Sequence, residues 1–142
     1  MQFGTICLVG PHQCFDQQLM RLKRVRLLGH VAYADLPRLA RSANVLIMPY
    51  ADLPVTRAMQ PLKFKEYLAT GKPVVAARLP ATTEWTDAAD LVSTTDDFVS
   101  AVQRRIANGP DSKQLTARQR LADESWASKA HDFERLCLED AP

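Results

Sequence analysis

Five short apolar runs recur along the chain, and longer polar stretches separate them. The runs are rich in Val, Ile and Leu, and they cover residues 5–10, 25–29, 45–50, 73–77 and 90–94. Each run is too short for a helix, and most end in Gly, Pro or polar residues, which is typical of buried strands. Because the runs are apolar on both faces, the pattern favours a parallel sheet that helices cover on either side.

The intervening stretches place apolar residues at helical spacing. Asp35 is a candidate N-cap for the second helix, Gly109 is a stop signal for the fourth, and Ser125 is a candidate cap for the last. The last helix carries Trp126 and Phe133 on one side, together with Ala130 and Cys137. We predict helices over residues 13–23, 34–43, 61–70 and 96–109, and two more within 112–139.

Strand and helix alternate five times before the extra helices, and this order predicts the α/β class. We expect a Rossmann-like, doubly wound parallel sheet of about five or six strands in the order 3-2-1-4-5, with extra C-terminal helices. The chain has 142 residues and no linker-like segment. We therefore interpret 1–142 as one domain, large enough for its own core.

Composition removes several classes of function. A net charge of +2 is too small to indicate a nucleic-acid partner. The three cysteines match no zinc or redox motif, and no pair of the three histidines has metal-ligand spacing, so we expect no metal. We expect no signal peptide and no transmembrane segment, and hence a cytoplasmic protein with reduced thiols.

The stretch 59–77 combines helix signals with candidate binding chemistry. Pro61 suits a first helical turn, while Phe64 and Leu68 are one turn apart and can face the sheet. Ligands of doubly wound sheets bind beyond the carboxyl ends of the strands, and free N–H groups at a helix start favour an anion. Lys63 would add a cation there, and Glu66 could accept hydrogen bonds from ribose hydroxyls. On spacing alone, however, a simple i, i+3 ion pair between Lys63 and Glu66 is favoured, worth about 0.2–0.5 kcal/mol.

Three segments in this order resemble a known family: 25–50, 56–80 with P-L-K-x-x-E-Y-L-A-x-G-K-P-V-V at 61–75, and 118–136. They resemble the donor-binding half of B-type-fold bacterial group 1 glycosyltransferases of the polysaccharide-assembly type. The resemblance implies a Rossmann-like nucleotide-sugar donor-binding domain. It also implies a transferase that moves a sugar from a nucleoside-diphosphate sugar, of UDP or GDP type, to a glycan or lipid-linked acceptor, with retention.

The resemblance also implies roles for individual residues. Glu66 would hold the donor ribose, and Lys63 and Arg57 would stabilise the leaving diphosphate without a metal, since no Asp-x-Asp pair occurs in the chain. His30 and Val31 would border the base. The loops at 10–11, 50 and 55–60 would border the phosphates and the sugar. The residues implied around the donor are Gly10, Pro11, His30, Val31, Tyr50, Thr56, Gln60, Pro61, Leu62 and Glu66.

Two departures from the family pattern qualify these expectations. Many relatives carry a further glutamate eight residues before the one that matches Glu66, and this chain has Ala58 at that position. The fold also needs two halves, so we expect the N-terminal acceptor domain to be absent and the isolated chain to be inactive. The full-length enzyme would be cytoplasmic or peripheral at the inner membrane. The alternatives are a non-catalytic α/β interaction module and half of a nucleotide-sugar epimerase.

Overall fold

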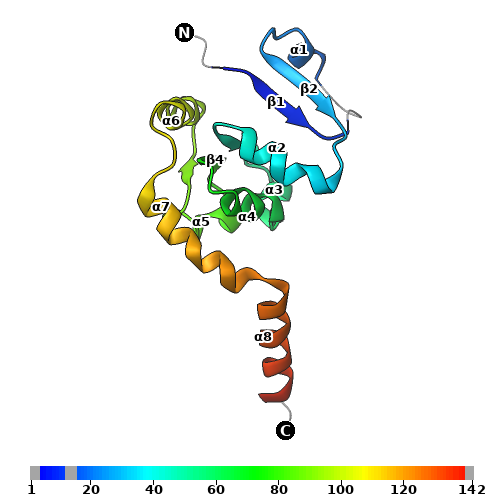
Figure 1. The fold of residues 1–142 in the computed structure, drawn as a ribbon, viewed down its shortest axis with the longest axis vertical. Helices are drawn as coiled ribbons and strands as arrows, with labels where there is room; N and C mark the ends of the chain where they lie inside the picture. The colour runs from blue at the N-terminus through cyan, green and yellow to red at the C-terminus, as the bar shows by residue number, and fades with distance from the viewer. Residues whose placement is uncertain (1–3, 12–15, 140–142) are drawn as a thin grey trace. The chain divides into compact units, whose positions relative to one another are not determined.

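The structure of the protein, a computed structural model, describes residues 4–11 and 16–139. The chain divides into two compact units, Met1–Ser42 and Ala43–Pro142, and Figure 1 labels most of their elements. The first unit comprises β1 (Ile6–Val9), α1 (Gln17–Met20), β2 (Val25–Gly29), the 3₁₀ helix η1 (Tyr33–Asp35) and α2 (Leu36–Ser42). The second comprises β3 (Leu46–Met48), α3 (Pro54–Ala58), α4 (Leu62–Ala69), β4 (Val74–Ala77), α5 (Pro80–Thr83), β5 (Asp90–Val92), α6 (Thr95–Asn108), α7 (Ser112–Ala117), η2 (Arg118–Glu124) and α8 (Trp126–Glu139).

In the first unit, β1 and β2 pair in parallel, with Ile6 opposite Val25. The helix predicted over 34–43 is present as η1 followed by α2. Asp35 stands directly before α2, and its carboxylate lies 3.6 Å from the Arg38 guanidinium. The helix predicted over 13–23 is shorter: α1 begins after Asp16, whose carboxylate accepts the Gln18 N–H at 2.8 Å. Residues 13–15 of that prediction lie outside the described residues.

The second unit is built on a parallel sheet in which β4 is the central strand, between β3 and β5. Three consecutive residues of β4, 74–76, have no exposed surface, so both faces of this strand are covered. Phe64 and Leu68 of α4 are 1% exposed and belong to the same core, and α6 packs against β4 and β5. In Figure 1, β4 lies between α6 and the pair formed by α3 and α4. The run of apolar residues at 73–77 is therefore a strand buried on both faces, as its composition predicts.

The α/β class and all five predicted strands are confirmed. The predicted order 3-2-1-4-5 needs one correction, because it separates strand 3 from strand 4. In the structure β3 and β4 pair directly, with Leu46 opposite Val74. The connection between them carries the short α3 as well as α4, and a helical crossover of this kind commonly places consecutive parallel strands side by side.

The two longest helix predictions in the second unit agree with the structure to within a residue or so. α4 begins after Pro61, and α6 begins after Thr94, whose hydroxyl accepts the Asp97 N–H at 3.1 Å. Both helices end at a glycine with positive φ, Gly71 at +73° and Gly109 at +72°. Because that backbone region is strained for residues with a side chain, glycine suits these ends.

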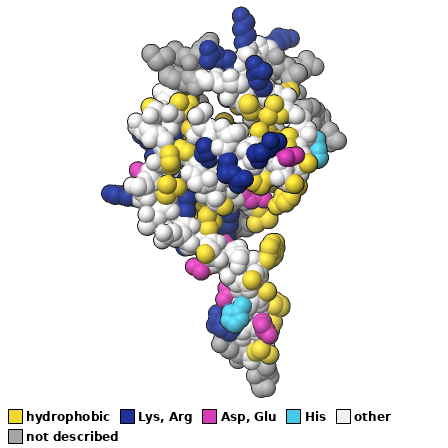
Figure 2. Space-filling view, in the orientation of Figure 1, with side chains coloured by type: hydrophobic (Ala, Val, Ile, Leu, Met, Phe, Trp, Pro, Cys, Tyr) yellow, Lys and Arg dark blue, Asp and Glu magenta, His cyan; other side chains and the backbone are white. Residues whose placement is uncertain are grey.

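The C-terminal segment is anchored at η2 and exposed at α8. Ser125 caps α8, as predicted, by accepting the Ser128 N–H at 3.1 Å. The predicted apolar side of α8 is exposed: Trp126 keeps 85% of its surface and Phe133 keeps 71%. Figure 2 shows hydrophobic side chains along one edge of this segment. Within residues 4–11 and 16–139, no helix has the length and apolar character needed to cross a membrane.

Candidate functional site

Two similar turns follow β3 and β4 and form the carboxyl edge of the second unit's sheet. Residues 51–56 and 77–82 share the pattern A-x-L-P-x-T. In the first turn, the Thr56 hydroxyl accepts the Leu53 N–H at 2.9 Å and lies 2.5 Å from the Ala51 carbonyl. Thr82 accepts the Leu79 N–H at the same distance. Each threonine therefore caps the short helix that its turn begins, α3 or α5, and the hydroxyl of Thr56 is engaged within the protein.

Arg57, a predicted cation of the site, is bound to a neighbouring carboxylate. Its guanidinium donates two hydrogen bonds to Asp52, at 2.6 and 2.7 Å. The hydrogen bond from Arg57 holds the pKa of Asp52 below its usual value, and the same bond raises the pKa of Arg57. Both side chains are exposed, so Arg57 is held at the surface of the α3 turn.

The start of α4 has the polarity that the sequence predicts. Pro61 occupies the N-cap and supplies no side-chain cap. Phe64 and Leu68 turn into the core, so Lys63 and Glu66 lie on the outer side of the helix. The Lys63 ammonium donates to the Glu66 carboxylate at 2.6 Å, and each side chain is a little under half exposed. The i, i+3 ion pair that the spacing favours is therefore present.

Two tyrosines lie near the Lys63–Glu66 pair, Tyr67 on α4 itself and Tyr50 in the segment after β3. Burial raises the pKa of the Tyr67 hydroxyl, and the nearby charges of Tyr50 and Glu66 raise it further, while Lys63 opposes them. Tyr50 is 36% exposed. The structure thus brings together Tyr50, Lys63, Glu66 and Tyr67, three of which the sequence singles out as site residues.

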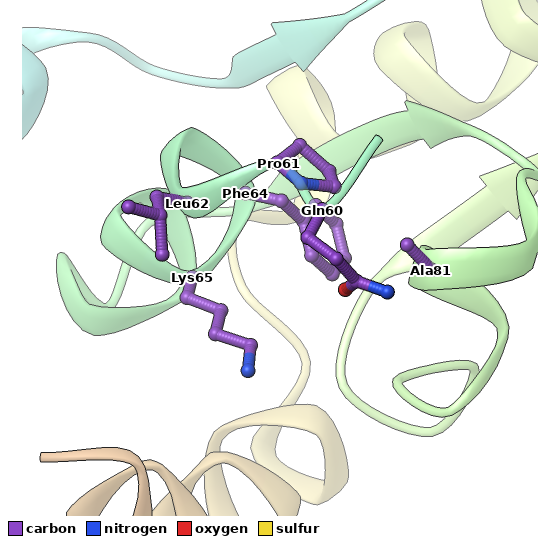
Figure 3. Close-up of a pocket in the computed structure, with 6 residues that line it drawn as sticks. All are labelled: Gln60, Pro61, Leu62, Phe64, Lys65 and Ala81. Atoms are coloured by element: carbon purple, nitrogen blue, oxygen red, sulfur yellow. The ribbon is translucent and has the colours of Figure 1, made fainter. Parts of the chain in front are cut away.

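A small hollow lies on another side of the α4 start (Figure 3). Its volume is about 30 Å³, room for a water molecule or one small chemical group. Lys63 and Glu66 do not contribute to it, whereas Lys65, which sequence reasoning passed over, does. The lining residues are Gln60, Pro61, Leu62, Phe64, Lys65 and Ala81, of which Gln60, Pro61 and Leu62 belong to the predicted site.

The remaining predicted residues lie in the first unit, at the carboxyl ends of β1 and β2. The Gly10 N–H donates to the Gly29 carbonyl at 2.9 Å, which ties the ends of these two strands together. Pro11 and His30 are exposed and Val31 is half-buried. The four predicted residues Gly10, Pro11, His30 and Val31 therefore follow adjacent strands. Among the described residues, no group of three or more His, Cys, Asp or Glu side chains has the arrangement of a metal site.

Comparison with known proteins identifies the family. The sequence model of "Glycosyl transferases group 1" matches residues 4–108, which include β1 to β5 and the whole of α4. The chain belongs to this family. A curated relative, the putative teichuronic acid biosynthesis glycosyltransferase TuaH of Bacillus subtilis (strain 168), is 30% identical over 130 residues. That match covers 83% of this chain and 32% of TuaH.

Two solved structures share the fold of this group 1 family member. AviGT4, a glycosyltransferase involved in avilamycin A biosynthesis, matches with a TM-score of 0.67 and 22% identity, over 96% of this chain and 44% of AviGT4. HepE of Anabaena, solved in complex with UDP-glucose, matches with a TM-score of 0.64 and 20% identity, over 94% of this chain and 40% of HepE. The predicted family and fold are confirmed, and the chain spans a third to less than half of the length of these relatives.

Proposed function

We propose that residues 1–142 are one donor-binding domain of a glycosyltransferase. The enzyme would transfer a sugar from a nucleoside-diphosphate sugar to a glycan or lipid-linked acceptor. The observation that carries the proposal is the start of α4, because an uncapped helix end, an ammonium and a carboxylate meet there, inside the segment that matches the family. HepE was solved with UDP-glucose and with UDP, so UDP is the first nucleotide to consider for this chain.

In the proposed complex, the donor diphosphate lies before the first turn of α4. The backbone N–H groups of this turn and the helix dipole favour an anion. Lys63 donates to a phosphate oxygen, and Glu66 accepts from the ribose hydroxyls. The existing Lys63–Glu66 pair is worth only about 0.2–0.5 kcal/mol, whereas a charge-assisted hydrogen bond to the ligand is worth about 1.5–3 kcal/mol. Exchange of partners on donor binding is therefore favourable.

The chemical step separates the sugar from the diphosphate, and negative charge grows on the departing phosphate oxygens. Lys63 and the α4 amides would stabilise that charge, and Arg57 would join them by releasing Asp52. These groups would perform the stabilisation without a metal ion. Retention of configuration is part of the proposal by family resemblance.

The acceptor belongs, in this proposal, to an N-terminal domain outside residues 1–142. Such a domain would supply the opposite wall of the reaction cleft, so the 142-residue chain alone would bind donor without turnover. We place the full-length enzyme in the cytoplasm, at the inner membrane surface where a lipid-linked acceptor requires it.

The test is calorimetric titration of the 142-residue chain with UDP, GDP and ADP. We expect one diphosphate to bind, and we expect Lys63→Ala or Glu66→Ala to weaken that binding at least tenfold, from the energy of a charge-assisted contact. Lys113→Ala on α7 is the matched control, because Lys113 is exposed and lies on another helix. If neither site variant changes the affinity, the site assignment is wrong. If none of the three nucleotides binds, a non-catalytic interaction module becomes the better account.

A further inference from the structure

A cluster of charged and aromatic side chains connects the start of α4 to the C-terminal segment. We call it the Lys65 cluster, and it consists of Lys65, Trp85, Arg120, Glu124 and Lys129. The Lys65 ammonium donates to the Glu124 carboxylate and lies 5.9 Å from the centre of the Trp85 ring. The other oxygen of Glu124 accepts from Lys129, in the first turn of α8, at 3.1 Å. Nothing in the family pattern given above assigns a role to these residues.

The position of Glu124 is set by η2, which is fixed to the body of the unit. The Arg120 guanidinium stacks on the Trp85 ring, 4.2 Å from its centre. It also donates to both carboxylate oxygens of Asp87, at 2.7 and 2.8 Å. Arg118, at the beginning of η2, is buried and donates to backbone carbonyls. Glu124 therefore ends a segment that is held at two arginines, and its carboxylate reaches Lys65 from a defined place.

Lys65 keeps hydrogen-bonding capacity beyond its bond to Glu124. An ammonium has three N–H donors, and its hydrogen bond to Glu124 uses one of them. Lys65 lines the hollow at the α4 start together with Gln60, and both side chains extend to the same side in Figure 3. Lys63, by contrast, is hydrogen-bonded to Glu66 on the outer side. Lys65 is thus the lysine of α4 that both lines the hollow and is held from outside the helix.

We propose that Glu124 is a positioning residue: it holds the Lys65 ammonium beside the start of α4, where Lys65 helps to bind the diphosphate of the donor. This inference rests on the proposed function. A lysine has four rotatable bonds, and fixing it costs conformational entropy that a positioned side chain has already lost. With Glu124 and Trp85 in place, an arriving phosphate meets an ammonium that is already near it.

Charge alone predicts the opposite change in diphosphate affinity from the positioning role, and this difference makes the proposal testable. Glu124→Gln removes a negative charge from the vicinity of an anion site, and simple electrostatics therefore predicts tighter diphosphate binding. If Glu124 positions Lys65, the same variant weakens UDP binding, by about three- to tenfold. Lys65→Met, which keeps the apolar stem, weakens binding by a similar factor. In the Lys65→Met background, Glu124→Gln causes no further loss, because the side chain that it positions is gone.

Two matched controls accompany these single and double variants of Glu124 and Lys65. Asp123→Asn removes the same charge one residue earlier, where the carboxylate is exposed, and it should leave UDP affinity within twofold. Lys129→Met removes the other partner of Glu124 and should also leave affinity within twofold. The thermal midpoint of every variant is measured, and Glu124→Asp, which retains the charge, serves as a second variant if Glu124→Gln does not fold. If Glu124→Asp weakens UDP binding in the parent and has no effect in the Lys65→Met background, that result also supports the positioning role.

The outcomes separate this inference from the proposed function. If the parent binds no diphosphate, or Lys63→Ala and Glu66→Ala have no effect, the proposed function fails first. If those variants behave as expected but Glu124→Gln tightens UDP binding or leaves it unchanged, the positioning role is overturned and the donor site stands. Equal weakening by Glu124→Gln with and without Lys65 also overturns it, because the effect would then not pass through Lys65.

Discussion

The strongest test of the second unit's architecture is the replacement of Arg118 by methionine. Arg118 is 6% exposed, and burial lowers the pKa of its guanidinium. It donates to the carbonyls of Ala88 and Lys72, each at 2.8 Å, and lies 3.4 Å from the carbonyl of Leu68. One side chain thereby joins η2 to the end of α4, the loop before β4 and the segment before β5. Methionine has a side chain of similar length but no hydrogen-bond donor.

The magnitude follows from what the substitution leaves behind. Backbone carbonyls cannot be removed by mutation, so at least two buried acceptors lose a charged donor in Arg118→Met. A hydrogen bond to a charged group contributes about 1.5–3 kcal/mol, and part of this is offset because burying the guanidinium is itself unfavourable. We expect a loss of about 3 kcal/mol in the free energy of unfolding. With a urea m-value of about 2 kcal/mol per molar, the midpoint falls by about 1.5 M.

The assay is urea unfolding followed by tryptophan emission. Trp85 is 2% exposed and Trp126 is 85% exposed, so the change in emission on unfolding reports chiefly on Trp85, which stacks on Arg120 of the same η2 segment. Arg38→Met is the matched control, since the Arg38 side chain is 85% exposed in a surface ion pair; it should change stability by no more than about 0.5 kcal/mol. A parental midpoint for Arg118→Met would refute the reasoning, because the carbonyls would then not require the guanidinium.

Two further predictions concern helix starts. Thr82→Val should cost about 1–3 kcal/mol of unfolding free energy, because it leaves the Leu79 N–H unpaired, and both Leu79 and Thr82 are buried. Thr56→Val, in the equivalent exposed turn, should cost less, and the urea midpoints of the two variants test this difference. Asp111 caps α7 by accepting N–H groups, which hold its pKa below 3.8. A depressed pKa contributes stability above pH 3.8 that is lost as the pH falls through the folded value, so Asp111→Ala should be less stable than the parent at pH 7 and equal to it in strong acid. A constant difference between the two across that range would contradict this account.

The sequence predicts elements best where one local signal dominates. All five strands were predictable because each is an apolar run bounded by Gly, Pro or polar residues, and α4 and α6 because their apolar stripes lie between clear start and stop residues. α3 and α5 escaped prediction because five and four residues are too few to show a helical period. The repeated A-x-L-P-x-T pattern would have revealed them, since proline suits a first helical turn and threonine can cap it.

The strand order was the part of the fold that local patterns could not supply. Pairing of β3 with β4 depends on how the connection through α3 and α4 crosses the sheet, and no residue pattern within either strand encodes that choice. The exposed apolar side of α8 was also unpredicted. Periodicity shows that Trp126 and Phe133 share one side of a helix, but it does not show what, if anything, that side packs against.

In the candidate site too, contacts between residues close in sequence were predictable and contacts between distant residues were not. Lys63 and Glu66 are three residues apart on one helix, so their pairing follows from spacing. Lys65 donates a hydrogen bond to Glu124, 59 residues later, and no local pattern predicts this contact. The distinction also bears on charge. Lys63 and Glu66 neutralise each other, whereas in the Lys65 cluster two lysines share the single carboxylate of Glu124. Within that cluster we expect the position of the Lys65 ammonium, and not the additional charge of Lys129, to set the affinity for a diphosphate.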